Sequence, residues 1–217
     1  MLKIVIGNRA YSSWSLRGWL AAKQSGLAFE EVFFPLYEAD WEERRADPLL
    51  APSGGKVPIL WDGQAAAWNA LAIIDHLDRI SGGARFWPQD PAARAFAVSV
   101  AAEMQSSFQS LRGFCPMNTR RHYPGYALSK EAEADTRRVE ALWEAGLARF
   151  GGPWIAGAHY GAADIMFTPV ASRFTTYDVA LSAPAEALRQ RLMAHPFMGE
   201  WLAGAATEGH VLTRYEF

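Results

Sequence analysis

Short apolar runs alternate with amphipathic stretches in the first third of the chain, which predicts strands and helices in turn. Lys3–Ile6 and Phe29–Phe34 have the length and composition of two buried or half-buried strands. Between them, Leu16, Trp19 and Leu20 recur at the spacing of one helix face. A strand, a helix and a second strand in this order favour a parallel strand pair with a right-handed crossover.

A hairpin and a further helix follow this unit. Val57–Trp61 and Ala65–Trp68 flank Asp62-Gly63, and Asp-Gly is among the strongest short hairpin signals. A short charged helix is expected over Asp40–Ala46, and an amphipathic helix follows the hairpin, marked by Leu71, Ile74 and Leu77. The predicted order is βαβαββα, a small mixed sheet with helices on both faces.

The remainder of the chain predicts a helical bundle. Asp90-Pro91 has an N-cap residue followed by a first-turn proline. Two apolar stripes then predict long helices, one through Phe96, Val100, Met104, Phe108 and Leu111 and one through Val139, Leu142, Trp143, Leu147 and Phe150. Shorter helices are expected near Asp164–Phe174, Pro184–Met193 and Pro196–Ala205. We therefore expect an α/β domain over residues 1–81, a linker over 82–90 and an all-α domain over 91–217.

Composition and charge narrow the class of protein. The 217 residues carry 21 Lys+Arg against 23 Asp+Glu, a net charge of −2, so affinity through phosphate neutralisation and a nucleic-acid partner are not expected. No uninterrupted apolar run is long enough to span a membrane, and the apolar N-terminal run is too short for a signal-peptide core. The single cysteine, Cys115, excludes an intramolecular disulfide and fits a reducing compartment, most simply the cytoplasm.

The first candidate chemical segment is Tyr11–Arg17, between the first strand and the first helix. Hydroxyls at a helix N-terminus lie where unpaired backbone N–H groups and the helix dipole favour an anion. Ser12 and Ser15 also have the spacing of a Cys-x-x-Cys redox site with both sulfurs replaced by oxygen. A serine there cannot form a disulfide, but it can donate a hydrogen bond to a bound thiolate. Plain N-capping by Ser12 or Ser13 explains the same residues.

The second candidate is Lys56-Val57-Pro58, at the start of a strand. Proline lacks an N–H, so it is tolerated at a strand start or edge. A cis bond before Pro58 would present the backbone N–H and C=O of Val57 to a peptide-like ligand. The histidines show no metal-ligand spacing, so no metal is expected.

Together these segments resemble the glutathione S-transferase superfamily over essentially the whole chain. The matching segments are Ser12–Arg17, Ser53–Leu60, Trp68–Ile74 and, in the helical domain, Gly161–Asp164. The first of them looks most like the serine-type bacterial members near the zeta class. The resemblance implies a thioredoxin-like N-terminal domain, an all-helical C-terminal domain and a cytoplasmic homodimer with a detoxification role.

The resemblance also implies a function and a site. Glutathione would be the co-substrate, and its thiol would attack a small hydrophobic electrophile. Ser12 would hydrogen-bond the sulfur, with Ser13 assisting, and Val57 before Pro58 would pair with the cysteinyl backbone. Lys56 could take the glycyl carboxylate. The electrophile is expected between the domains, near Trp14, Met104, Phe108 and Arg112.

The chain departs from the family at Asn69-Ala70, where an acid-Ser pair usually binds the γ-glutamyl end. Asn69 is neutral and Ala70 has no side-chain donor, so part of the recognition is lost. A lost charge-assisted hydrogen bond corresponds to roughly a tenfold to hundredfold loss of affinity. We expect weak glutathione binding or preference for another thiol. Gly161 replaces the usual Ser or Thr cap, but Asp164 can still reach back to its N–H.

Two other functions fit the same residues. A transferase-like binding protein would be catalytically idle because Asn69-Ala70 cannot orient glutathione. A glutathione-dependent isomerase of the zeta type would use the serine motif, with Arg17, Arg112 or Arg120 holding an acidic substrate. Leu49 and Leu50, before the hairpin, are either core residues or the apolar plug of a dimer.

Overall fold

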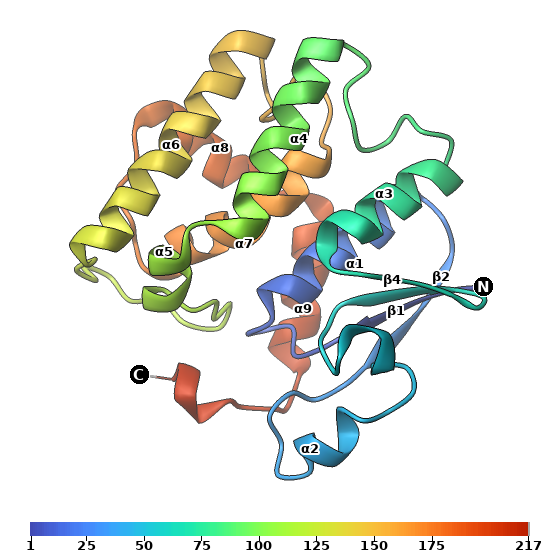
Figure 1. Cartoon of the computed structure of the whole chain (residues 1–217). Coiled ribbons are helices and arrows are strands. Elements are labelled where there is room, and N and C mark those ends of the chain that lie inside the picture. Colours follow the sequence, from blue (N-terminus) through green and yellow to red (C-terminus); the bar gives the residue numbers. More distant parts are fainter. Residues whose placement is uncertain (217) are drawn as a thin grey trace.

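The computed structural model describes residues 1–216, and the order of its elements confirms the fold expected from the sequence. The N-terminal domain contains β1 (Leu2–Ile6), α1 (Ser13–Ser25), β2 (Phe29–Phe33), α2 (Trp41–Arg44), β3 (Ile59–Asp62), β4 (Ala65–Trp68) and α3 (Ala70–Ile80). The C-terminal domain contains α4 (Pro91–Ser106), α5 (Gln109–Phe114), α6 (Lys130–Phe150), α7 (Ala162–Thr176), α8 (Ala183–Met193) and α9 (Pro196–Thr207). Figure 1 shows the helical bundle beside the sheet, with the two domains meeting along α1.

The sheet has the mixed topology that the element order predicts. Its strands lie in the order β2-β1-β3-β4; β1 pairs in parallel with β2, and β3 pairs antiparallel with β1 and β4. Side chains of β1 alternate between the two faces. Ile4 and Ile6 join the main core beneath α1 and α3, whereas Val5 joins a smaller core with Leu50 and Ile59 on the face near α2. Leu50 is thus a core residue.

The apolar stripe from Phe96 to Leu111 was expected to form one long helix, but it forms two helices with a break between them. The helix α4 ends at Ser106, and Phe108 has a φ of +61° before α5 begins at Gln109. The apolar spacing continues across the break because both pieces bury the same side of the chain. Cys115 caps the C-terminal end of α5, and Asn118–His122 lies beyond it, outside any helix.

The start of α7 is fixed by a buried carboxylate. Asp164 accepts hydrogen bonds from the Gly161 N–H and the Ile155 N–H, each at 3.0 Å, which confirms the reach-back contact expected from the sequence. Burial raises the pKa of Asp164 to about 7, although the backbone N–H donors act in the opposite direction. The carboxylate therefore holds both the helix start and the preceding loop.

We expect this carboxyl group to make the protein more stable at pH 5 than at pH 7. Its pKa is higher in the folded state than in the unfolded chain, so the folded state binds more protons in this window, and the free energy of unfolding falls as pH rises. Asp164→Asn has no such proton, so its unfolding free energy should decline less between the two pH values. Urea unfolding of both proteins measures this difference, and equal pH dependence would contradict it.

Candidate active site

Ser12 begins α1 as its N-cap residue. Its Oγ accepts from the Ser15 N–H at 3.2 Å, and its hydroxyl donates to the Ser15 Oγ at 2.8 Å. Ser15 is fully buried and its Oγ also accepts from the Gly7 N–H at 2.9 Å, so it fastens the helix to the end of β1. The two serines at Cys-x-x-Cys spacing therefore have different positions, and Ser12 is the more accessible of the two.

Ser13 is held from the other domain. The Arg173 Nη2 on α7 donates to the Ser13 Oγ at 3.2 Å, which leaves the serine proton free to donate elsewhere. Burial lowers the pKa of Arg173 to about 10. The guanidinium is therefore still charged near neutral pH, and its positive charge makes the Ser13 hydroxyl a better donor toward an anion.

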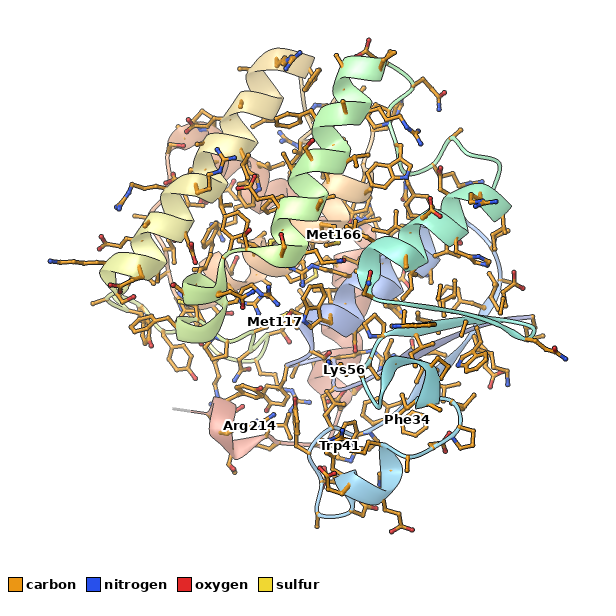
Figure 2. All side chains as sticks on the ribbon, in the orientation of Figure 1. Phe34, Trp41, Lys56, Met117, Met166 and Arg214 are labelled. Atoms are coloured by element: carbon orange, nitrogen blue, oxygen red, sulfur yellow. The ribbon has the colours of Figure 1, made fainter. Side chains whose placement is uncertain are left out.

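Both serines line a cavity of about 380 Å³ between the domains. Its wall combines aromatic and cationic side chains with the two serines, and includes Tyr11, Ser12, Ser13, Trp14, Tyr37, Arg112, Met117, Arg173 and Tyr215. Figure 2 shows Met117 in the middle of the molecule, between the helical bundle and α1. The C-terminal segment that carries Arg214 lies below it and supplies Tyr215 to the wall.

A second cavity of about 380 Å³ shares Trp14 with the first. It is lined by Trp14, Ser53, Lys56, Val57, Pro58, Trp68, Asn69 and Gln105. The Val57–Pro58 bond is cis. The structure thus gathers Trp14, the loop before β3 and the start of α3 around one hollow, next to the serines.

The N-terminus of α3 is already partly capped by side chains. Asn69 has a φ of +61°, and its Oδ1 accepts from the Ala72 N–H at 3.2 Å. Gln105, on α4, accepts from the Leu71 N–H at 3.3 Å through its Oε1. Ala70 is fully buried and is absent from the walls of both cavities. Gln105 is not among the residues expected from the sequence, where its only signal is a polar residue within an apolar helix.

The residues expected around the electrophile separate into two groups. Arg112 and Trp14 line the cavity that contains the serines. Met104 and Phe108 are buried in the main core and line neither of the two cavities. Arg173 was not singled out in the sequence, although an arginine within the apolar stretch of α7 is a visible departure from the pattern.

Cys115 is not a candidate nucleophile. Its side chain is buried, and desolvation raises the pKa of the thiol to about 11, so it remains protonated near neutral pH. Within residues 1–216, no cluster of three or more His, Cys, Asp or Glu side chains is arranged to hold a metal ion. No helix in that same span is long and apolar enough to cross a membrane.

Comparison with known proteins gives the same family for both domains. The sequence model described as "Glutathione S-transferase, N-terminal domain" matches residues 11–80, and "Glutathione S-transferase, C-terminal domain" matches residues 126–204. Together they cover more than half of the chain. Glutathione S-transferase 4 of Zea mays is 25% identical over 210 residues, which cover 91% of this chain and 85% of the maize protein.

Solved structures share the fold at low sequence identity. A glutathione transferase homologue from Burkholderia with bound glutathione has a TM-score of 0.71 at 18% identity, over 95% of this chain and 99% of that one. A diazinon-metabolizing glutathione S-transferase from the silkworm Bombyx mori has a TM-score of 0.72 at 18% identity, over 94% and 96%. With both of its domains matched in order, the chain belongs to the glutathione S-transferase superfamily.

Proposed function

We propose that the chain is a serine-type glutathione transferase. The thiolate of bound glutathione attacks an electrophilic carbon, a C–S bond forms, and the leaving group departs with the bonding electrons. With chlorodinitrobenzene as a small hydrophobic electrophile, the C–Cl bond breaks, chloride leaves, and the thiol proton is released to solvent. The observation that carries this proposal is that Ser12 and Ser13 lie at the N-terminus of α1 and line the interdomain cavity. Trp14 lines both this cavity and the second one.

The serine end of the site favours a thiolate over a thiol. A free thiol has a pKa of about 8.5, so only a few per cent is ionised near pH 7. The N-terminus of α1 contributes the positive end of its dipole, and the Ser13 hydroxyl, held by Arg173, has a proton to donate. Each unit by which the pKa falls gives nearly ten times more nucleophile while most of the thiol is protonated.

The rest of glutathione would occupy the second hollow. In this placement, the backbone of Val57 pairs with the cysteinyl residue, and Lys56 takes the glycyl carboxylate. The side chain of Lys56 makes no ion pair among the described residues. Figure 2 shows Lys56 below the centre of the molecule, on the same side as the C-terminal segment. Trp14 lines both cavities, so glutathione bound in the second cavity would extend its thiol past Trp14 toward the serines.

The γ-glutamyl end has an unusual set of partners. The Asn69 oxygen and the Gln105 oxygen cap α3, so the backbone N–H groups of Ala72 and Leu71 are already taken. The Gln105 amide nitrogen makes no hydrogen bond to another described residue, and this side chain lines the hollow. We propose that this NH₂ group donates to the γ-glutamyl carboxylate, in place of the serine hydroxyl that is missing at Ala70.

Gln105→Glu is expected to weaken glutathione binding by about tenfold or more. The new carboxylate can still accept from the Leu71 N–H, so the start of α3 is retained. It replaces a donor by a negative charge facing the ligand carboxylate, and one lost charge-assisted hydrogen bond corresponds to about tenfold to a hundredfold in affinity. Isothermal titration with glutathione measures the change.

Gln89→Glu is the matched control for this substitution. It makes the same charge change in the linker, at a residue that lines neither of the two adjoining cavities. Its glutathione affinity should stay near that of the parent. Unchanged affinity in Gln105→Glu would remove Gln105 from the binding site.

The other sequence-based alternatives remain predictions. An idle binding protein is favoured by Asn69-Ala70 and would bind glutathione without serine-dependent conjugation. A zeta-type isomerase would convert a maleyl-type substrate at constant glutathione. The cytoplasmic homodimer is likewise an expectation that size-exclusion and localisation measurements would test.

The direct test of the proposed function is glutathione-dependent release of chloride from chlorodinitrobenzene by the purified chain. Activity that depends on the hydroxyls of Ser12 and Ser13 supports a transferase. Equal rates with and without the protein would contradict it.

A further inference from the structure

Three arginine side chains, from α1, α5 and α7, lie close to Ser13 or Trp14, and none of them pairs with a carboxylate in the described part of the chain. Arg17, on α1, is fully buried; its Nε donates to the Met166 carbonyl at 2.8 Å, and its Nη1 donates to the Ser13 carbonyl at 3.2 Å. Its Nη2 is buried and has no hydrogen-bond partner. None of the ion pairs within residues 1–216 involves Arg17, Arg112 or Arg173.

Trp14 and Ser13 connect the three guanidinium groups. The Cζ of Arg17 lies 4.7 Å from the centre of the Trp14 ring, and the Cζ of Arg112 lies 4.8 Å from it. Arg173 donates to the Ser13 Oγ. Arg112 and Arg173 line the interdomain cavity directly, and Arg17 adds a third positive charge next to Trp14.

The backbone carbonyls of Ser107, Cys115 and Pro169 accept hydrogen bonds from Arg112 and Arg173, but neutral acceptors leave the positive charge of the cluster unbalanced. Burial lowers the pKa of each of these arginines, and their mutual repulsion lowers it further at Arg17 and Arg173. Buried charges are normally paired, because removing a charge from water without a partner is strongly unfavourable. The carboxylate of Glu216 lies near the cavity, but it accepts hydrogen bonds from Tyr11, Asn118 and Arg121 and pairs with none of the three arginines.

We propose that Arg112 and Arg173, backed by Arg17, form a subsite for a carboxylate carried by the electrophilic substrate. The proposal rests on the transferase function above and specifies its substrate class: an electrophile in which a carboxylate is attached to an aromatic or conjugated planar frame. Guanidinium groups bind carboxylates through directed, charge-assisted hydrogen bonds. Tyr11, Tyr37 and Tyr215 provide aromatic walls for the planar part.

The cluster differs from the arginines expected in the sequence. Arg120 is one of the three arginines that the sequence offers as alternatives for holding an acidic substrate, and its guanidinium donates to the backbone carbonyls of Ala205, Glu208 and His210. It therefore holds the segment after α9 in place, and it is not a wall residue of the cavity. Arg173 replaces it in the subsite, from a position far along the chain from Arg17.

Paired probes test the charge recognition without chemistry. Cinnamate and cinnamamide have nearly the same size and shape, but only cinnamate is an anion. We expect the parent protein to bind cinnamate about tenfold to a hundredfold more tightly than cinnamamide, measured by isothermal titration at 0.15 M salt. In Arg112→Gln most of this preference should be lost while cinnamamide affinity is unchanged, and Arg112→Lys should retain part of it.

Arg137→Gln is the matched control, because it removes an equal charge from an exposed position on α6 that lines neither cavity. It should keep the parental preference. The proposal is overturned if the parent binds neither probe or binds both equally. It is also overturned if Arg112→Gln keeps the full preference, or if the variant weakens glutathione binding while leaving cinnamate unaffected; that last result would assign the arginine to a carboxylate of glutathione.

Chloride release from chlorodinitrobenzene in the same preparations separates this inference from the proposed function. A parent that prefers cinnamate but releases no chloride retains the anion subsite and contradicts the transferase. A parent that conjugates the neutral chloride and shows no cinnamate preference keeps the transferase and refutes the carboxylate subsite.

Discussion

Removing the hydroxyls of Ser12 and Ser13 together is expected to lower kcat/KM for glutathione conjugation by about a hundredfold or more. Both serines line the interdomain cavity, and the double variant loses two hydroxyls at the N-terminus of α1. Ser13 has a free proton to donate to the thiolate, whereas the Ser12 hydroxyl must turn away from the Ser15 Oγ to do so. The apparent pKa of bound glutathione in the pH–rate profile should then rise toward its value in solution, which is a change that loss of stability alone does not produce. Steady-state kinetics across pH measures both effects.

The single substitutions distinguish the roles of the two serines. Ser12→Ala also removes the N-cap contact to Ser15, which costs about 1 kcal/mol of stability, so unfolding must be measured beside activity. Ser12→Thr keeps both the hydroxyl and the cap, and it should retain most of the activity. Ser13→Ala removes the hydroxyl whose proton is free. Parental activity and an unshifted pH profile in the double variant would exclude both serines from the mechanism.

The local parts of the fold could be predicted because their signals lie within a few residues. The Asp90-Pro91 helix start follows from backbone preferences and occurs where expected. The hairpin also forms, but Asp62 pairs with Ala65 at the end of β3, so the two-residue loop is Gly63-Gln64, one position later than expected. The contact from Asp164 to the Gly161 N–H spans only three residues. The break at Phe108 could not be found in this way, because the apolar period continues through it and only the packed chain shows its positive φ.

In the candidate site too, only the features that depend on neighbouring residues can be predicted from the sequence. The Ser12 cap was visible because a serine preceded an amphipathic run. By contrast, the hydrogen bond between Gln105 and the Leu71 N–H joins residues 34 positions apart. The one between Arg173 and Ser13 joins residues 160 positions apart. Those contacts depend on how the two domains pack, and a single sequence carries no direct signal of that packing. The contacts of Arg120 with the carbonyls after α9 likewise appear only in the packed chain.

Gly146→Ala is expected to destabilise the protein by about 3 kcal/mol, although alanine is the better helix former by about 1 kcal/mol. A Cβ at Gly146, on α6, would lie 2.1 Å from the Ile155 carbonyl oxygen and 2.9 Å from the Phe96 ring. The oxygen belongs to the backbone, and the neighbouring Ile155 N–H is held by Asp164 at the start of α7. To make room for the Cβ, either the loop moves and breaks this buried contact or α6 shifts away from the loop, and both changes destabilise the protein. Urea unfolding measures the loss.

Gly199→Ala provides the opposite expectation at a matched position. Gly199 also lies within a helix, α9, but a Cβ there meets no atom within 4 Å. The substitution should therefore stabilise the protein by up to about 1 kcal/mol, through helix propensity and a less flexible unfolded chain. Because both changes add one methyl group to a helical glycine, their difference reports the contacts with Ile155 and Phe96. Similar unfolding free energies for the two variants would show that the loop yields, and that Asp164 does not fix α6 against α7.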